Sequence, residues 1–171
     1  MENNRLLLLD SDALIKLNRA GVLVQVVGSF SCVIPMAVYE EVVTAGRAHR
    51  YPDADAIEAA LANFEIVPGN ATFGAGLGLG AGERAILDLL TRMQDAIVVS
   101  DDRRFLSVLS LEGAPFLTPA DVLVVMNGTG VLSGPKARNG LELLRPLIRT
   151  SAYWDARNDL ESSRGSSRGE K

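Results

Sequence analysis

The chain is almost devoid of cysteine and histidine, with Cys32 and His49 as the only examples among 171 residues. A single cysteine excludes an internal disulfide and any cysteine cluster for zinc or iron–sulfur. We expect Cys32 to be a core thiol in a reducing, cytoplasmic compartment. His49 lies in a polar, arginine-containing stretch and is expected at the surface. A Ser-His-Asp triad would have to use it, and no serine stands in a nucleophile-elbow sequence.

Aromatic residues and long apolar runs are also scarce. Aromatics make up 5% of the chain, so a platform for stacking nucleic-acid bases is not evident. The apolar segments are far shorter than the roughly 20 residues that a membrane span needs. The residues before Leu6 lack the basic region and cleavage site of an export signal. We therefore expect neither export nor membrane association.

The net charge of −4 argues against a general affinity for nucleic acid. The charge is unevenly spread, however, because residues 134–171 carry more basic than acidic groups. Two interpretations stay open at this point. The basic groups could meet phosphates, or they could belong to a solvated helical face and a charged tail.

A chain with 47% hydrophobic and 22% charged residues is typical of one globular domain. Short apolar runs alternate with segments of helical periodicity, which predicts an α/β fold with a central parallel sheet. The expected strands are 6–9, 31–34, 64–67, 96–99 and 116–118. The expected helices are 13–20, 22–27, 36–44, 52–62, 83–93, 102–111, 119–126, 141–148 and 153–160. Polar breaks are expected at 46–50 and 128–134, a helix perturbation at Pro146, and a loop over 68–82.

Aspartates follow two of the predicted strands. Asp10 ends the run Leu6–Leu9, and Asp101 and Asp102 follow the run 96–99. Aspartate packs poorly at the end of a buried strand but is well placed at the carboxyl edge of an open α/β sheet, where ligands gather. Asp12 is expected to cap the next helix, whereas Asp10 is better explained by function. One of Asp101 and Asp102 could cap its helix, and the sequence does not say which.

Two glutamates on predicted helices are further candidates. Glu41 borders the apolar stripe of the helix 36–44, while Glu40 points away from it. Glu83 follows the glycine-rich loop and could simply complement a helix dipole. The loop has a GxGxxA spacing but no Gly-Lys-Ser/Thr ending, so it is better interpreted as a flexible loop than as a nucleotide site. Carboxylates that converged would repel one another unless they were protonated or bridged by a hard divalent cation.

At these residues the chain resembles the PIN-domain family of metal-dependent ribonucleases, particularly the VapC-type toxins. Four segments carry the resemblance: 6–15 (LLLLDSDALI), 33–42 (VIPMAVYEEV), 78–86 (GLGAGERAI) and 98–105 (VVSDDRRF). Their acids align on Asp10, Glu41, Glu83 and either Asp101 or Asp102. The family usually has a small hydroxyl or amide residue at the position of Asp12, which could add a ligand here or disturb the site.

The resemblance implies a three-layer α/β/α sandwich, a Mg²⁺ or Mn²⁺ cofactor, hydrolysis of RNA, homodimers and often a small antitoxin partner. We therefore expect a PIN-like nuclease domain over residues 1–128 and a C-terminal helical extension of the same domain over 129–161. Residues 162–171, rich in Ser, Gly and Arg, are expected to be disordered.

The working hypothesis is that the protein is a Mg²⁺- or Mn²⁺-dependent endoribonuclease, and that it could be the toxin of a toxin–antitoxin pair. Divalent ions held by carboxylates can activate water and offset the charge of the phosphate, so this chemistry does not need histidine. The expected catalytic residues are Asp10, Glu41, Glu83, Asp101 and Asp102. Those expected to hold metal are Asp10, Glu83, Asp101 and Asp102. Arg103 or Arg104 is expected to steer the scissile phosphate.

Two alternatives stay open. The segment Asp10-Ser11-Asp12 also fits the Asp-x-Asp of haloacid-dehalogenase-like phosphatases, in which the first aspartate is a covalent nucleophile. That scheme needs a suitably placed lysine, and Lys16 does not look well placed from the sequence. The other alternative is a non-catalytic PIN-like interaction module, because a fold does not guarantee an activity.

Overall fold

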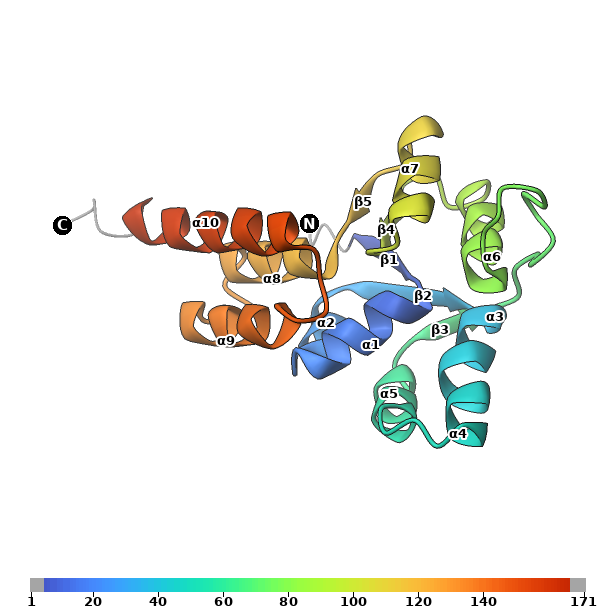
Figure 1. Cartoon of the computed structure of the whole chain (residues 1–171), viewed down its shortest axis with the longest axis horizontal. Coiled ribbons are helices and arrows are strands. Elements are labelled where there is room, and N and C mark those ends of the chain that lie inside the picture. Colours follow the sequence, from blue (N-terminus) through green and yellow to red (C-terminus); the bar gives the residue numbers. More distant parts are fainter. Residues whose placement is uncertain (1–4, 167–171) are drawn as a thin grey trace.

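The computed structural model describes residues 5–166 and has a five-stranded, all-parallel sheet at its centre (Figure 1). The strand order is β3-β2-β1-β4-β5. The strands are β1 (Leu6–Leu9), β2 (Ser31–Pro35), β3 (Glu65–Val67), β4 (Ile97–Val99) and β5 (Phe116–Leu117). The α/β fold class and the parallel sheet predicted from the sequence are confirmed.

Helices cover both faces of the sheet. In Figure 1, α1 (Ser11–Arg19) and α5 (Ala54–Leu61) lie on one side, and α6 (Ala81–Leu90) and α7 (Arg103–Leu111) lie on the other. The short helix α2 (Leu23–Ser29) packs against both α1 and α5. Strands covered on both faces are continuously apolar, and Leu8 and Leu9 of β1 are accordingly fully buried. These layers form the three-layer sandwich that the resemblance implied.

The helix after β2 is longer and less regular than the sequence predicted. It begins as α3 (Met36–Tyr39), widens into the π-helical segment η1 (Glu40–Ala45) and continues as α4 (Gly46–Ala48). The break expected from residue 46 therefore comes later. Gly46 is buried against Ala54, where a Cβ would lie 3.2 Å from that side chain, and the chain turns only at Arg50, whose φ is 59°.

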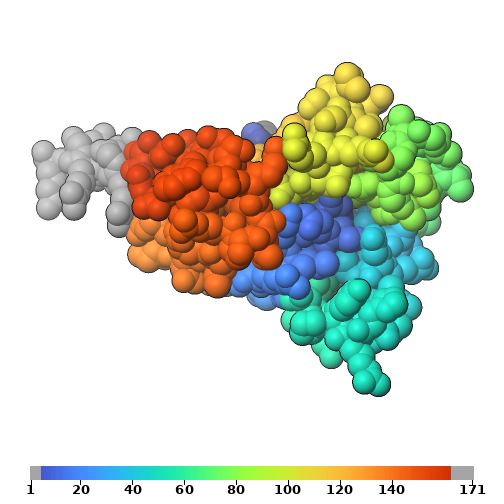
Figure 2. Space-filling model, in the orientation of Figure 1, coloured from blue at the N-terminus to red at the C-terminus, as the bar shows by residue number. Residues whose placement is uncertain are grey.

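The C-terminal helices pack together at one end of the sheet, beside α1 (Figure 2). They are α8 (Pro119–Gly128), α9 (Gly134–Leu144) and α10 (Thr150–Ser166). The helix predicted at 141–148 starts earlier, because Ser133 caps it and Pro135 fits its first turn. It ends before Pro146, which therefore follows the helix instead of perturbing it. Helix α10 includes residues 162–166 of the segment expected to be disordered, and residues 167–171 lie outside the described part of the chain.

Two further predictions concern residues away from the sheet edge. Cys32 is a buried free thiol, and burial raises its pKa to about 12. His49 is exposed and stacks on Tyr51. The expected burial of Cys32 and the expected surface position of His49 are confirmed. Within residues 5–166, no helix has the length and apolar character needed to cross a membrane.

Candidate active site

The predicted acids gather at the carboxyl edge of the sheet, between β1 and β4. These strands are neighbours, with Leu9 paired to Val99, although the chain after β1 leads away to β2 on the other side. Such a reversal in strand order opens a crevice at the ends of the strands. A cleft of about 770 Å³ lies here, and its lining includes Asp10, Glu41, Glu83, Asp101 and Asp102. All five acids that the sequence analysis expected to be catalytic therefore line one cleft, and their catalytic role stays a prediction.

Asp10 directly follows β1 and is the N-cap residue of α1. Its backbone N–H donates to Val99 O at 3.2 Å, and its Oδ1 accepts the N–H of Ala13 at 2.7 Å. The capping role expected for Asp12 therefore belongs to Asp10, because Asp10 has the extended backbone of an N-cap residue. Asp12 lies in the first turn instead. Capping does not exclude a second role, because the other carboxylate oxygen of Asp10 is not used by the cap.

Burial raises the pKa of Asp10 to about 7, although hydrogen bonds from Ser100 and Ala13 oppose the rise. The negative charges of Asp12 and Glu83 raise this pKa further. Asp10 is only 4% exposed. A carboxyl group held in this way is readily protonated near neutral pH, and a positive charge close by would favour its anionic form.

Glu83 lies in the first turn of α6, where its Oε2 accepts the backbone N–H of Gly80 at 2.7 Å. The pKa of Glu83 is also raised, chiefly by burial, with the charges of Asp102 and Glu41 adding to the rise. The Gly80 hydrogen bond and Arg104 act in the opposite direction. Glu83 therefore interacts electrostatically with Asp10, Glu41 and Asp102.

Glu41 reaches the cleft from the π-helical segment η1. Its Oε2 accepts a hydrogen bond of 2.6 Å from Ser11 Oγ at the start of α1. Gly82 lets α6 approach closely, since a Cβ there would lie 2.8 Å from Val38 Cγ2 and 3.3 Å from Glu41 Oε2. Short π-helical segments are frequent at functional sites, and here one carries a candidate catalytic acid.

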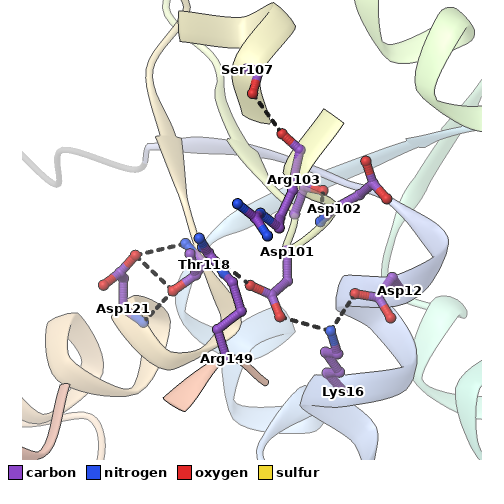
Figure 3. Close-up of polar contacts among 10 residues, drawn as sticks. Asp12, Lys16, Asp101, Asp102, Arg103, Ser107, Thr118, Asp121 and Arg149 are labelled. Atoms are coloured by element: carbon purple, nitrogen blue, oxygen red, sulfur yellow. Dashed lines mark hydrogen bonds and ion pairs between the residues drawn. The ribbon is translucent and has the colours of Figure 1, made fainter. Parts of the chain in front are cut away.

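Asp101 and Asp102 have different surroundings (Figure 3). Asp101 is buried, and its Oδ2 accepts a hydrogen bond from Lys16 Nζ at 2.8 Å. Asp102 is exposed, caps α7 through the N–H of Phe105, and points away from Lys16. Asp102 is therefore the member of the pair that interacts electrostatically with Glu83.

Sequence reasoning missed Lys16 and Arg149, which both line the cleft. Lys16 stands four residues after Asp12, a spacing that pairs charges on one helix face, and this signal was available in the sequence. No local signal pointed to Arg149, which follows α9 and approaches Asp101 to 3.8 Å. Burial alone would lower the pKa of Lys16, but hydrogen bonds from it to Asp101 and Asp12 outweigh that effect and raise the pKa.

The two arginines proposed to steer phosphate also differ. Arg103 lines the cleft, whereas Arg104 donates from Nη1 to Gly78 O at 2.9 Å and holds the glycine-rich loop. Arg103 is thus the better placed of the two for a ligand in the cleft.

The donor set suits a hard divalent cation. As placed, no three acidic side chains among residues 5–166 surround a common point closely enough to hold an ion. The acidic side chains of the cleft nevertheless supply only oxygen donors, and burial together with neighbouring negative charge raises the pKa values of Asp10 and Glu83. Mg²⁺ and Mn²⁺ prefer such oxygen ligands, so the residues fit this group in their chemistry.

Comparison with known families agrees with the geometry. The sequence model of the family DUF3368, described as a PIN domain, matches residues 6–157. The chain belongs to the PIN-domain family. A search of curated proteins finds no match to the chain. PIN domains are generally nucleases and typically use divalent metals, so nuclease activity is the general function that membership indicates. Membership in the PIN-domain family argues against the haloacid-dehalogenase-like phosphatase.

Proposed function

We propose that this PIN domain is a Mg²⁺- or Mn²⁺-dependent endoribonuclease that hydrolyses phosphodiester bonds in RNA. The observation that carries the proposal is the set of four electrostatically coupled acids in one cleft at the switch point of the sheet. These four, called here the acid cluster, are Asp10, Glu41, Glu83 and Asp102.

Within the acid cluster, Asp10, Glu83 and Asp102 would hold the cation. Asp102 is favoured over Asp101 because the Asp101 carboxylate is already neutralised by Lys16. When bound, a divalent cation supplies a nucleophilic water at neutral pH and offsets charge on the phosphate. Glu41, whose carboxylate is hydrogen-bonded by Ser11, would accept a proton from that water or orient it in the cleft.

Basic side chains at the cleft supply the attraction for an anionic substrate. Arg103 and Arg149 both line it and are both exposed. Guanidinium groups bind phosphate oxygens through paired N–H donors. Arg103 and Arg149 therefore support the binding of a polyanionic backbone next to the acid cluster.

The test is cleavage of a fluorescent single-stranded RNA by purified protein with Mn²⁺ and with excess chelator. We expect cleavage with Mn²⁺, none with chelator, and loss of at least about a hundredfold in rate for Asp10→Asn, which keeps the helix cap but removes the charge. Asp95→Asn is the matched control because Asp95 is exposed and does not line the cleft.

Survival of full activity in Asp10→Asn would refute the proposal. A DNA strand of the same sequence decides whether RNA is the preferred substrate. Mn²⁺ binding without cleavage of any RNA would favour the non-catalytic interaction module.

The biological setting that we propose is the cytoplasm, with the protein acting as a homodimeric toxin held in check by a small antitoxin. This part rests on the family resemblance. It is tested by co-expression with any short reading frame found immediately upstream. We expect the protein encoded by that reading frame to form a stable complex that suppresses RNA cleavage. RNA cleavage at an unchanged rate in the presence of that protein would contradict the toxin–antitoxin proposal.

A further inference from the structure

The six acids of the cleft fall into two groups. The first is the acid cluster. The second consists of Asp12 and Asp101, with Lys16 between them, and is called here the lysine bridge (Figure 3). Both groups lie in the same cleft at the carboxyl edge of the sheet.

The lysine bridge is short, and its Lys16–Asp101 pair is largely shielded from water, whereas the side chain of Asp12 is 46% exposed. Lys16 Nζ lies 2.6 Å from Asp12 Oδ2 and 2.8 Å from Asp101 Oδ2. The side chain of Lys16 is 12% exposed and that of Asp101 is 3% exposed. At this depth ion pairs are weakly screened by salt, and the lysine is held in place by both acids.

Asp101 needs this positive charge because an unpaired buried carboxylate is strongly destabilising. Its Oδ1 is buried and, within the described residues, accepts no hydrogen bond. Arg149 Nη2 lies 3.8 Å from that oxygen. Asp101 is therefore balanced by the chain's own cations.

A second divalent ion in this cleft would need oxygen donors beyond those of the acid cluster. Asp12 and Asp101 are the remaining acids of the lining, and Lys16 is paired with both. An ion there would have to displace a buried ammonium group that carries the same sign of charge.

We propose that Lys16 takes the place of a second divalent ion, so that the cleft binds one such ion per chain. This inference rests on the proposed function, because it assumes that the acid cluster binds the first ion. The fixed charge of Lys16 then acts beside that ion on a phosphate in the cleft. Asp12 serves the lysine bridge and is not a metal ligand.

The experiment counts bound Mn²⁺ without RNA, by titrating purified full-length protein and measuring free Mn²⁺ by electron paramagnetic resonance. We expect one ion per chain for the wild type, and none for the Asp10→Asn, Asp102→Asn double variant. Lys16→Met removes the charge at similar length and should raise the count to two. Lys16→Arg keeps the charge and should leave the count at one.

A fourth variant tests whether the second ion binds at Asp101. Lys16→Met combined with Asp101→Asn removes both the ammonium and the carboxylate and should return the count to one. It also avoids leaving a buried carboxylate unpaired, so it is expected to fold even if Lys16→Met does not. Circular dichroism confirms the fold of each variant before titration.

The outcomes separate the two proposals. Two ions in the wild type, or one ion in folded Lys16→Met, overturns the inference while the metal-dependent nuclease stands. No ion in the wild type overturns both. If Lys16→Met does not fold, the wild-type count still decides, because one ion supports the inference and two ions overturn it.

Discussion

Ser11 Oγ donates a hydrogen bond of 2.6 Å to Glu41 Oε2 and so ties the start of α1 to the π-helical segment η1, thirty residues away. The contact fixes the direction of a glutamate that is otherwise exposed. It also joins the helix after β1 to the helical segment after β2, and both residues line the cleft.

Replacing Ser11 by alanine should free Glu41. A carboxylate free to turn out of the cleft no longer meets the reacting groups in a fixed orientation, so we expect kcat/KM for RNA to fall roughly tenfold, about 1.4 kcal/mol in the barrier. Stability should change little because the site is exposed. Steady-state cleavage assays and thermal unfolding measure the two effects.

Two variants control the Ser11 experiment. Ser11→Thr keeps the hydroxyl and should retain most activity. Ser162→Ala removes an exposed hydroxyl that bonds only its own helix and should leave kcat/KM unchanged. Equal kcat/KM in Ser11→Ala and wild type would contradict an orienting role for Ser11.

The raised pKa of Asp10 predicts the pH dependence of the metal-free protein. The pKa is about 7 in the folded state and 3.8 in the reference state. The folded state therefore binds the proton more tightly, and this contribution to stability is fully present below pH 3.8 and is lost as the pH rises through 7. Stability with chelator should fall between about pH 4 and 7.

Asp10→Asn keeps a capping side chain and removes the titrating group. It should be more stable than the wild type at pH 8 with chelator, and the difference should shrink toward pH 4. Each kcal/mol corresponds to roughly 2–4 °C in Tm for a chain of this size. Mn²⁺ should raise the Tm of the wild type at pH 8 and not that of the variant. Parallel pH profiles of Tm for the two proteins would rule out Asp10 as the source.

Gly82→Ala should disturb both packing and the site. Its Cβ would meet Val38 Cγ2 at 2.8 Å and Glu41 Oε2 at 3.3 Å. Overpacking of this kind costs about 1–3 kcal/mol, and it should also displace Glu41 and lower kcat. Denaturant unfolding and single-turnover cleavage report the two losses separately.

Gly128→Ala is the matched control for Gly82→Ala. It lies in a helix, and nothing stands within 4 Å of its added Cβ. It should be neutral or slightly stabilising. If the two alanine variants unfold at the same denaturant concentration, the close approach of α6 to η1 is not important for stability.

Arg149→Gln should weaken RNA binding more than it slows chemistry. Removing one phosphate contact should reduce the slope of log affinity against log salt by about 0.7 for a single strand. Fluorescence anisotropy on the Asp10→Asn background measures this without cleavage. Arg92→Gln is the control, because Arg92 is exposed, pairs with Asp88 and does not line the cleft. An unchanged slope in Arg149→Gln would remove Arg149 from the RNA-binding surface.

The sequence by itself determined the strands, the parallel α/β class and the acids of the cleft. Runs such as Leu6–Leu9 are buried on both faces, and their composition alone indicates this. An aspartate directly after such a run must emerge at the carboxyl edge of the sheet. Asp10, Asp101 and Asp102 were predictable for this reason, because each position follows from local spacing.

Only the tertiary structure decided which acids belong to the acid cluster and which are paired with Lys16. Lys16 and Asp101 are 85 residues apart, and their contact depends on β1 lying next to β4. Arg149 reaches the cleft because the C-terminal helices pack beside α1, and Glu41 is positioned through η1. Hydrogen bonds and ion pairs between distant segments depend on the register of strands and the packing of helices, which no local pattern of residues specifies.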